Sequence, residues 1–243
     1  MITYKEVEKK TMNPEKKKAA KNDFFAFYVG RPISYIVTIP FLYTNVTPNT
    51  ISLISIIPLL IGFLLFCVAN TKIFLILGLV CFFIWNLLDG VDGNIARYKN
   101  LFSDIGSVYD ALNGYVAMVL SFFAVGVAAE NNGGFLSRYI NVPNNLILIC
   151  GALSGIFVIF PRLILHKRLS TLKDTGSVTR IKNKENYGLK EIFALNITSV
   201  TGFVQVFILI AILFELLDVF TVAYFFINLV IMIFSIKSVL QTR

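Results

Sequence analysis

Three aspartates, Asp89, Asp92 and Asp110, stand in a chain that is otherwise strongly apolar. They belong to segments long enough to cross a membrane, where an ionised carboxylate near the bilayer centre costs about 2.5–3.5 kcal/mol on insertion scales. Carboxylates that meet in a weakly solvated place must protonate or bind cations, because like charges at close range cannot all stay ionised unaided. We therefore expect a cation site at these aspartates.

The residue types around the aspartates indicate which cation and which further ligand to expect. Ligation by oxygen alone, without Cys or His, favours a hard ion such as Mg²⁺, Mn²⁺ or Ca²⁺. Mg²⁺ typically takes a few carboxylates and completes its shell with water and substrate phosphates. Arg97 lies about one helical turn beyond Asp92, where it can bind a phosphate oxygen. Together these residues predict a diphosphate site.

Two successive helices must position these residues. Side chains three, four, seven and eight positions apart lie on one face of a helix. The sequence thus predicts one stripe in each helix, the first formed by Asp89, Asp92, Gly93, Ala96 and Arg97 and the second by Gly106, Asp110, Asn113 and Gly114. The small residues in both stripes permit close approach of the helices to each other or of a flat ligand to a helix. If these faces pack together, the three carboxylates converge.

The composition places both helices in an integral membrane protein. Hydrophobic residues make up 56% of the 243 residues and charged residues 15%, which is too apolar for an ordinary soluble domain. Apolar runs of about 20 residues can cross the hydrocarbon core as helices. We predict an all-α polytopic fold with six transmembrane helices at residues 48–68, 72–97, 105–129, 143–165, 194–216 and 218–239.

The beginning of the chain differs from the rest. Residues 1–22 are rich in lysine and lack the pattern of a signal peptide. Residues 24–46 place aromatic side chains beside an arginine and two prolines, which favours an amphipathic helix at the lipid interface over a seventh crossing. We therefore predict a basic cytoplasmic and interfacial segment over 1–46 and a six-helix transmembrane catalytic domain over 47–243, with a cytoplasmic loop at about 166–192.

The net charge of +8 does not indicate binding to nucleic acid, because the basic residues are distributed as in a membrane protein. In the six-helix arrangement, all 22 lysines and arginines except Lys72 and Arg138 fall on one side. The positive-inside rule places that side, with both termini, in the cytoplasm against anionic membrane lipids. We therefore expect a protein of the cell inner membrane with its active site facing the cytoplasm. An ion transporter would instead carry acids at mid-depth on successive helices.

Two further polar residues are candidates for binding substrate. Asn49 follows Thr47 and Pro48, which are typical of a helix N-cap and first helical residue, and it either lines the site or belongs to that helix start. Arg162 lies in an apolar run near the cytoplasmic face, where an arginine reaches out to phosphate of bulk lipid or of a bound lipid substrate. Asp104, or the serine before it, is interpreted as a helix cap.

The aspartate stretch resembles the signature of the CDP-alcohol phosphotransferase family of membrane enzymes. The pattern is D-x-x-D-G-x-x-A-R, eight residues, then G-x-x-x-D, and it is met by Asp89, Asp92, Gly93, Ala96, Arg97, Gly106 and Asp110. The stretch TPNTIS at 47–52 resembles the segment that opens the first span in many members. The resemblance covers about residues 40–240. It implies transfer of a substituted phosphoryl group from a CDP-linked alcohol to an acceptor hydroxyl, with release of CMP.

The resemblance also implies roles for individual residues. The ligands of Mg²⁺ or Mn²⁺ would be Asp89, Asp92 and Asp110, of which the last is expected to be catalytic. The residues expected to contact substrate are Asn49, Asp92, Gly93, Ala96, Arg97, Gly106 and Arg162. Gly93 and Ala96 would let the cytidine pack closely, and Arg97 would contact the diphosphate. A homodimer is implied, and one of the two substrates would be a lipid, in the synthesis of a phospholipid, glycolipid or envelope polymer.

The sequence departs from the family pattern at its last position. The pattern ends in an aspartate four residues after Asp110, where this chain has Gly114. In the family that carboxylate is taken to be the general base on the acceptor alcohol, and loss of a base typically costs about 10²–10⁴-fold in rate. Four explanations stay open. They are an active enzyme in which metal, substrate phosphate or Asp104 lowers the barrier, a substrate that supplies its own base, a catalytically weak or inactive relative that binds the CDP-alcohol, and a substitution introduced at 114.

Overall fold

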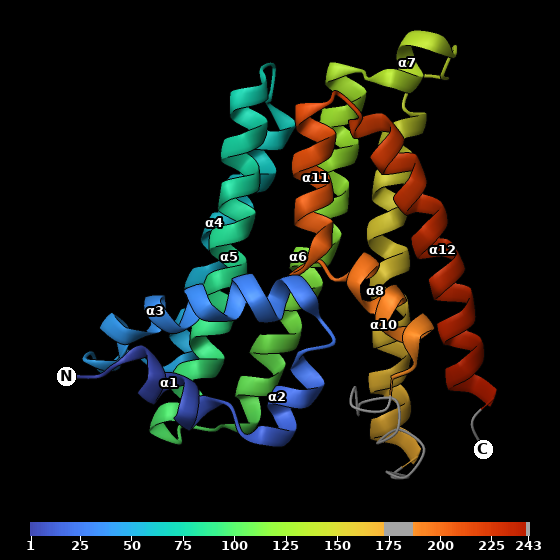
Figure 1. Cartoon of the computed structure of the whole chain (residues 1–243). Coiled ribbons are helices and arrows are strands. Elements are labelled where there is room, and N and C mark those ends of the chain that lie inside the picture. The colour runs from blue at the N-terminus through green and yellow to red at the C-terminus, as the bar shows by residue number, and fades with distance from the viewer. Residues whose placement is uncertain (173–186, 242–243) are drawn as a thin grey trace. The chain divides into compact units, whose positions relative to one another are not determined.

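The computed structural model describes residues 1–172 and 187–241, and the regular elements within these ranges are all helices (Figure 1). In chain order they are α1 (Tyr4–Thr11), α2 (Pro14–Ala20), the π-helix η1 (Ala26–Gly30), α3 (Arg31–Leu42), α4 (Pro48–Cys67), α5 (Lys72–Lys99), α6 (Asp104–Asn132), α7 (Phe135–Tyr139), α8 (Leu146–Leu172), α10 (Leu189–Thr198), α11 (Phe203–Leu213) and α12 (Leu217–Gln241). Of the predicted loop at 166–192, residues 166–172 belong to α8 and residues 173–186 lie outside the described ranges.

The predicted all-α membrane fold is confirmed, and the protein is an integral membrane protein. Within the described residues, five helical segments are long and apolar enough to cross a membrane. They number six if α10 and α11, which are bent by 54° at the break between them, form one span. The sequence predicts an unbroken helix at 194–216, whereas the structure begins α10 at Leu189 and interrupts the helix after Thr198.

The break between α10 and α11 has a local cause. The backbone amides of Gly202 and Val204 both donate to the carbonyl of Ser199, at 2.9 and 3.3 Å, instead of continuing the helical pattern. A Cβ atom at Gly202 would lie 2.8 Å from the Cβ of Ser199, so a larger residue would force this turn open. Ser199 Oγ donates to Asp23 at 2.9 Å, and Asn196 bonds to the backbone on both sides of Asp23. The break is thereby fastened to the residues that precede η1.

Local signals set the helix ends around the aspartate stretch. The predicted cap of α4 is confirmed, since Thr47 Oγ1 accepts the amide of the residue three positions on at 3.3 Å. Asn100 ends α5 in the left-handed region with φ 55°, a conformation that asparagine tolerates better than most residues. Ser103 Oγ accepts the amide of Gly106 at 3.1 Å, so the serine caps α6 and Asp104 is its first residue. These ends fix where the two stripes begin and stop.

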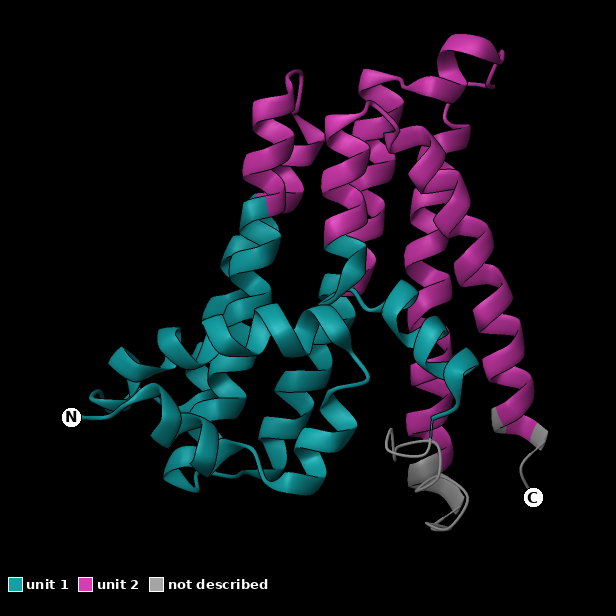
Figure 2. Cartoon of the chain, in the orientation of Figure 1, with its two compact units in different colours: residues 1–61, 80–117, 187–205 teal, residues 62–79, 118–186, 206–243 magenta. Residues whose placement is uncertain are grey.

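The chain divides into two compact units, which are coloured separately in Figure 2. Unit 1 comprises residues 1–61, 80–117 and 187–205, and unit 2 comprises residues 62–79, 118–186 and 206–243. All the motif residues from Asp89 to Asp110 belong to unit 1. We describe each unit by itself.

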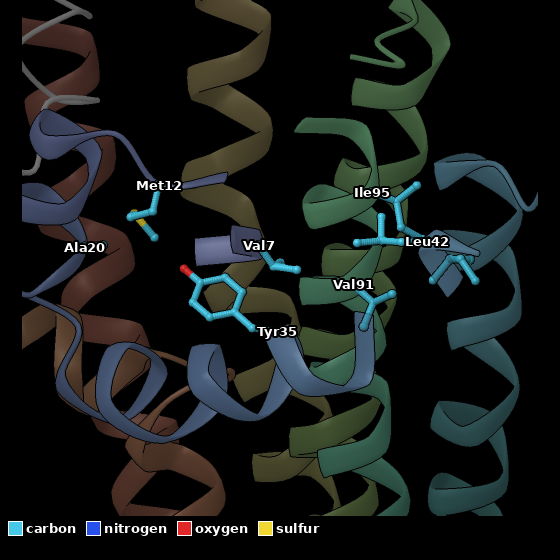
Figure 3. Packing of buried hydrophobic residues seen from close by; sticks show 8 residues of the cluster. Val7, Met12, Ala20, Tyr35, Leu42, Val91 and Ile95 are labelled. Carbon is cyan, nitrogen blue, oxygen red and sulfur yellow. The ribbon is translucent and has the colours of Figure 1, made fainter. Parts of the chain in front are cut away.

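The first 44 residues, here called the amino-terminal arm, pack into unit 1 as helices. Figure 3 shows side chains of α1 and α3 against α5 in one apolar cluster, whose buried members are Val7, Met12, Ala20, Tyr35, Leu42, Ile51, Val91 and Ile95. Tyr98 Oη donates to Glu6 at 2.5 Å, and Glu6 also pairs with Lys10 at 3.3 Å. Asn13 caps α2 by accepting the amide of Lys16 at 2.8 Å. The arm is therefore a docked part of the fold.

Unit 2 contains close backbone contact between α6 and α8. A Cβ atom at Gly151 would lie 2.7 Å from the Cα of Gly126 and 2.9 Å from the carbonyl oxygen of Phe122. A Cβ atom at Gly155 would lie 3.0 Å from the carbonyl oxygen of Val119. Small residues at such positions let transmembrane helices approach closely, which strengthens their van der Waals packing.

Candidate active site

A pocket in unit 1 is lined by residues from five helices and from the break between α10 and α11, and four of these helices contribute charged side chains. It is lined by Lys16, Ala26, Gly30, Arg31, Ser34, Asn86, Asp89, Gly90, Asp92, Gly93, Asn94, Arg97, Asp110 and Thr201. Its cavity volume is about 220 Å³, and it is open to solvent. Sites for small molecules and cofactors commonly measure about 300–1,000 Å³, so a nucleotide bound here would also extend into the open part of the pocket.

Three carboxylates occupy this pocket, two from α5 and one from α6. Asp92 is only 5% exposed and accepts a hydrogen bond from the hydroxyl of Ser52 on α4. Asp89 accepts a hydrogen bond from Asn113 Nδ2 at 3.2 Å. Asp110 is exposed. The two helical stripes expected from the sequence thus bring the three acids to one pocket.

A buried layer of polar side chains lies behind the acids. Asn113 is fully buried and uses its whole amide: Oδ1 accepts from Trp85 Nε1 at 2.9 Å, and Nδ2 donates to Ser55 Oγ at 2.7 Å and to Asp89. Ser55 Oγ in turn donates to the carbonyl of Ser52 at 2.7 Å. Because buried amides and hydroxyls are costly to leave unpaired, this layer fixes how α4, α5 and α6 meet around the carboxylates.

Three cations line the same pocket: Lys16 from α2, Arg31 from α3 and Arg97 from α5. Burial, followed by repulsion from Arg97 and Arg31, lowers the pKa of Lys16 to about 8. Arg97 Nη2 donates to Asn94 Oδ1 at 3.2 Å, but its Nε is buried and has no hydrogen-bond partner in the described part of the chain. A buried donor without a partner is costly, so the guanidinium is suited to an anionic ligand.

Glycines of α5 set the positions of neighbouring groups. A Cβ atom at Gly93 would lie 2.9 Å from Arg97 Nη2, so a larger residue there would displace the guanidinium. A Cβ atom at Gly90 would lie 3.0 Å from the Cβ of Ser34, which shows how closely α3 lies against α5. Asn94 Nδ2 donates to the hydroxyls of Ser34 and Thr38 across this contact, at 3.3 and 3.1 Å. The helix that carries Arg31 is thus held against the motif helix.

The other residues expected to contact substrate are not among those that line the pocket. They are Asn49, Ala96, Gly106 and Arg162. Asn49 Nδ2 donates to Ser103 Oγ at 3.4 Å, and a Cβ atom at Gly106 would lie 3.2 Å from Asn49 Oδ1, so Asn49 belongs to the contact between the start of α4 and the start of α6. Arg162 is an exposed residue of α8 in unit 2. Roles for these four residues in binding stay predictions.

The three carboxylates make the pocket a candidate site for a divalent metal ion. Its carboxylate oxygens are donors of the kind that Mg²⁺ prefers, and hydrogen bonds from Ser52 and Asn113 to two of them resemble the outer-shell support of metal ligands. Among the residues that the structure describes, however, no three Asp, Glu, His or Cys side chains are grouped closely enough to hold one ion. The ligand atoms that the pocket offers are therefore suited to a divalent ion. The three acids line the same pocket, but they are not close enough together to form a metal-binding cluster.

Several lining residues were not expected from the sequence. Asn86 and Asn94 flank the two α5 acids, and a search for polar positions on the acidic stripe of that helix would have found Asn86, three residues before Asp89. Ser52 and Ser55 form a polar pair within an otherwise apolar span, which is a usable signal. Lys16 and Arg31 carry no such signal, because they are part of a general excess of basic residues.

The fold and the pocket define an α-helical membrane protein with a charged, solvent-accessible site. The profile of CDP-alcohol phosphatidyltransferase matches residues 45–236. The chain therefore belongs to the CDP-alcohol phosphatidyltransferase family, and it is a membrane transferase of the phospholipid type, which takes a CDP-alcohol donor and an alcohol acceptor. A search of curated proteins found no match to the chain.

Proposed function

We propose that this protein transfers a substituted phosphate group from a CDP-linked alcohol to the hydroxyl of an acceptor, one of the two being a lipid. The bond between the transferred phosphorus and the oxygen of CMP breaks, a bond to the acceptor oxygen forms, and the hydroxyl proton passes to water or to the phosphate of the departing CMP. The observation that carries the proposal is that Asp89, Asp92, Arg97 and Asp110 of the family signature all line one pocket.

Within this proposal the residues of the pocket have distinct tasks. Arg97 binds the diphosphate with its unpartnered guanidinium nitrogen. Asp89, Asp92 and Asp110 would hold Mg²⁺ or Mn²⁺, which when bound neutralises phosphate charge and makes CMP a better leaving group. Asp110 is exposed on α6, one turn before Gly114, and we assign it a catalytic role beside the acceptor. Asn113 and Ser52 orient the two α5 carboxylates through their hydrogen bonds.

The alternative is a relative that binds the CDP-alcohol but turns it over weakly or not at all. It is favoured by Gly114, where the family has a carboxylate and where the structure leaves open space: a Cβ atom there would meet no heavy atom within 4 Å. The two functions differ in turnover and not in binding.

A CMP-release assay separates the two functions. The purified protein is incubated with a panel of CDP-linked donors, including CDP-diacylglycerol and small amino-alcohol and polyol esters, with and without Mg²⁺. We expect metal-dependent CMP release that falls at least about a hundredfold in Asp89→Asn, Asp92→Asn and Asp110→Asn. An absence of CMP from every donor, together with stabilisation of the protein by CDP against heat, would favour the binding protein. Normal turnover by the triple variant would refute the assigned roles.

The placement of the site in the cell is also a proposal. The basic residues support an inner-membrane protein with both termini and the pocket on the cytoplasmic side, where a CDP-alcohol is available. The family resemblance supports a homodimer, which cross-linking of the protein in native membranes would test.

A further inference from the structure

The pocket contains more positive charge than the family signature supplies. Of its three cations, only Arg97 belongs to the motif, while Lys16 and Arg31 lie in the amino-terminal arm. Both precede residue 45, where the match to the family begins. The arm therefore adds two charged side chains to a pocket whose acids come from the family region.

These two cations, the Lys16 ammonium and the Arg31 guanidinium, have no hydrogen-bond or ion-pair partner among the residues that the structure describes. By contrast Lys17, the next residue of α2, pairs with Glu8 at 2.8 Å. Lys16 is partly buried, and its lowered pKa reports that burial and the neighbouring arginines disfavour its charge. An anion bound among the three cations would relieve that repulsion.

The fold holds in place the helices that carry the two cations. Asn13 caps the helix that carries Lys16, and the apolar cluster around Val7 and Tyr35 docks the arm on α5. Arg31 opens α3, which the bonds of Asn94 hold against the motif helix. Because these helices are already in place, only the two side chains lose freedom when a ligand binds, which favours binding.

We propose that Lys16 and Arg31 form, beside Arg97, an anion-binding subsite that takes a phosphate or diphosphate group of a substrate. The group is either the diphosphate of the CDP-linked donor or a phosphate carried by the other substrate. The identity of the substrate in this inference rests on the proposed function. The binding of an anion does not, because it is inferred from the residues of the pocket. The amino-terminal arm is then part of the active site.

Binding measurements on the full-length protein in nanodiscs of zwitterionic lipid, with Mg²⁺ present, test the subsite. The probes are CDP, and inorganic phosphate added to the CDP-loaded protein. The variants are Lys16→Gln, Arg31→Gln and the double variant, and the matched control is Lys18→Gln, because Lys18 is an exposed residue of the same helix that does not line the pocket. Thermal midpoints establish that each variant is folded.

We expect each single substitution to weaken one probe about ten- to a hundredfold, while Lys18→Gln changes neither. Loss of CDP affinity assigns the subsite to the donor diphosphate. Unchanged CDP affinity with loss of phosphate binding assigns it to the other substrate. The subsite is refuted if the folded double variant binds both probes like Lys18→Gln, or if the wild-type protein binds neither.

CMP release measured on the same samples separates this inference from the proposed function. Phosphate binding that depends on Lys16 without any CMP release by the wild-type protein would refute the proposed function and leave the subsite standing. CMP release with binding that is indifferent to Lys16 and Arg31 would refute the subsite and leave the proposed function standing.

Discussion

Gly114 is the single residue whose environment bears most on turnover. It lies on α6 one turn after Asp110, and the space around its Cα is open. The Cβ atom of a larger side chain at this position would therefore displace no neighbour. With glycine at this position, the protein lacks the carboxylate that, in the family pattern, is taken to accept the proton of the acceptor hydroxyl.

We expect Gly114→Asp to raise the rate of CMP release at saturating donor by about 10²–10⁴-fold, because a positioned general base typically contributes that much. The control is Gly114→Asn, which has nearly the same size and no useful basicity, and which should leave the rate unchanged. The measurement is initial CMP release at equal protein concentrations. Equal rates in the wild-type protein and both variants would show that another group already accepts the proton.

Lys16 gives the pocket a dependence on pH. In the free protein its pKa is about 8, whereas a bound diphosphate favours the ammonium and raises that pKa. CDP itself is already fully ionised at pH 8, since the second pKa of a phosphate group is about 6. CDP binding therefore takes up a proton above pH 8, and affinity falls as pH rises through that window. The other charged groups lining the pocket are Arg31, Asp89, Asp92, Arg97 and Asp110.

Calorimetric titration with CDP at pH 8.5, in two buffers of different ionisation enthalpy, measures this proton uptake. We expect uptake in the wild-type protein and in Lys18→Gln, and little or none in Lys16→Gln, whose affinity should also vary less between pH 7 and 9.5. Equal uptake in all three proteins would assign the titration to another group.

At the scale of helices, the closest packing lies between α6 and α8 in unit 2. A side chain at Gly151 has no room, because both neighbouring atoms belong to the backbone of α6. We expect Gly151→Ala to lower the free energy of unfolding by about 1–3 kcal/mol, as overpacking commonly does. Gly114→Ala is the matched control on open space and should be neutral or stabilising by up to about 1 kcal/mol.

Unfolding of both variants in the same detergent, followed by circular dichroism during heating or titration with dodecyl sulfate, measures the difference. If Gly151→Ala and Gly114→Ala had the same free energy of unfolding, the contact between α6 and α8 would be looser than in the structure.

The sequence predicts a helix well where a physical requirement restricts its composition, and poorly where it does not. The spans near 48–68 and 72–97 are well predicted, because a helix that crosses lipid needs about 20 apolar residues in a row. The break at 199–202 is not, since Ser, Thr and Gly barely change the hydropathy of a long window. A helix was predicted over 24–46, where η1 and α3 lie, but α1 and α2 were not predicted. Their apolar residues, such as Val7 and Met12, are too sparse to show a helical period.

The site divides in the same way. Asp89, Asp92 and Asp110 are predicted because charged residues in membrane-spanning helices are rare and usually functional. The spacing of Asp89 and Asp92 also shows that these two lie on one face of their helix. Lys16 and Arg31 could not be predicted, because a lysine that faces a pocket and one that faces lipid headgroups look alike in sequence. Only the docking of the arm distinguishes them.

At the scale of the whole molecule, orientation in the membrane can be measured. Phe102 and Tyr139 are 72% and 75% exposed, and Phe102 precedes the start of α6 whereas Tyr139 follows its end. In a variant whose three cysteines are replaced by serine, we expect an impermeant maleimide to label Tyr139→Cys and not Phe102→Cys in spheroplasts, because the positive-inside rule keeps Phe102 in the cytoplasm. Labelling should become equal after the membrane is opened. The reverse pattern in intact spheroplasts would place the pocket outside the cell.

The docked arm also bears on how substrate choice is inherited. The residues most diagnostic of the reaction lie within 45–236, yet two cations of the pocket come from earlier in the chain. Two enzymes with the same aspartate signature can therefore prefer different compounds if their beginnings differ. Exchanging residues 1–44 between such enzymes would carry a preference from one to the other.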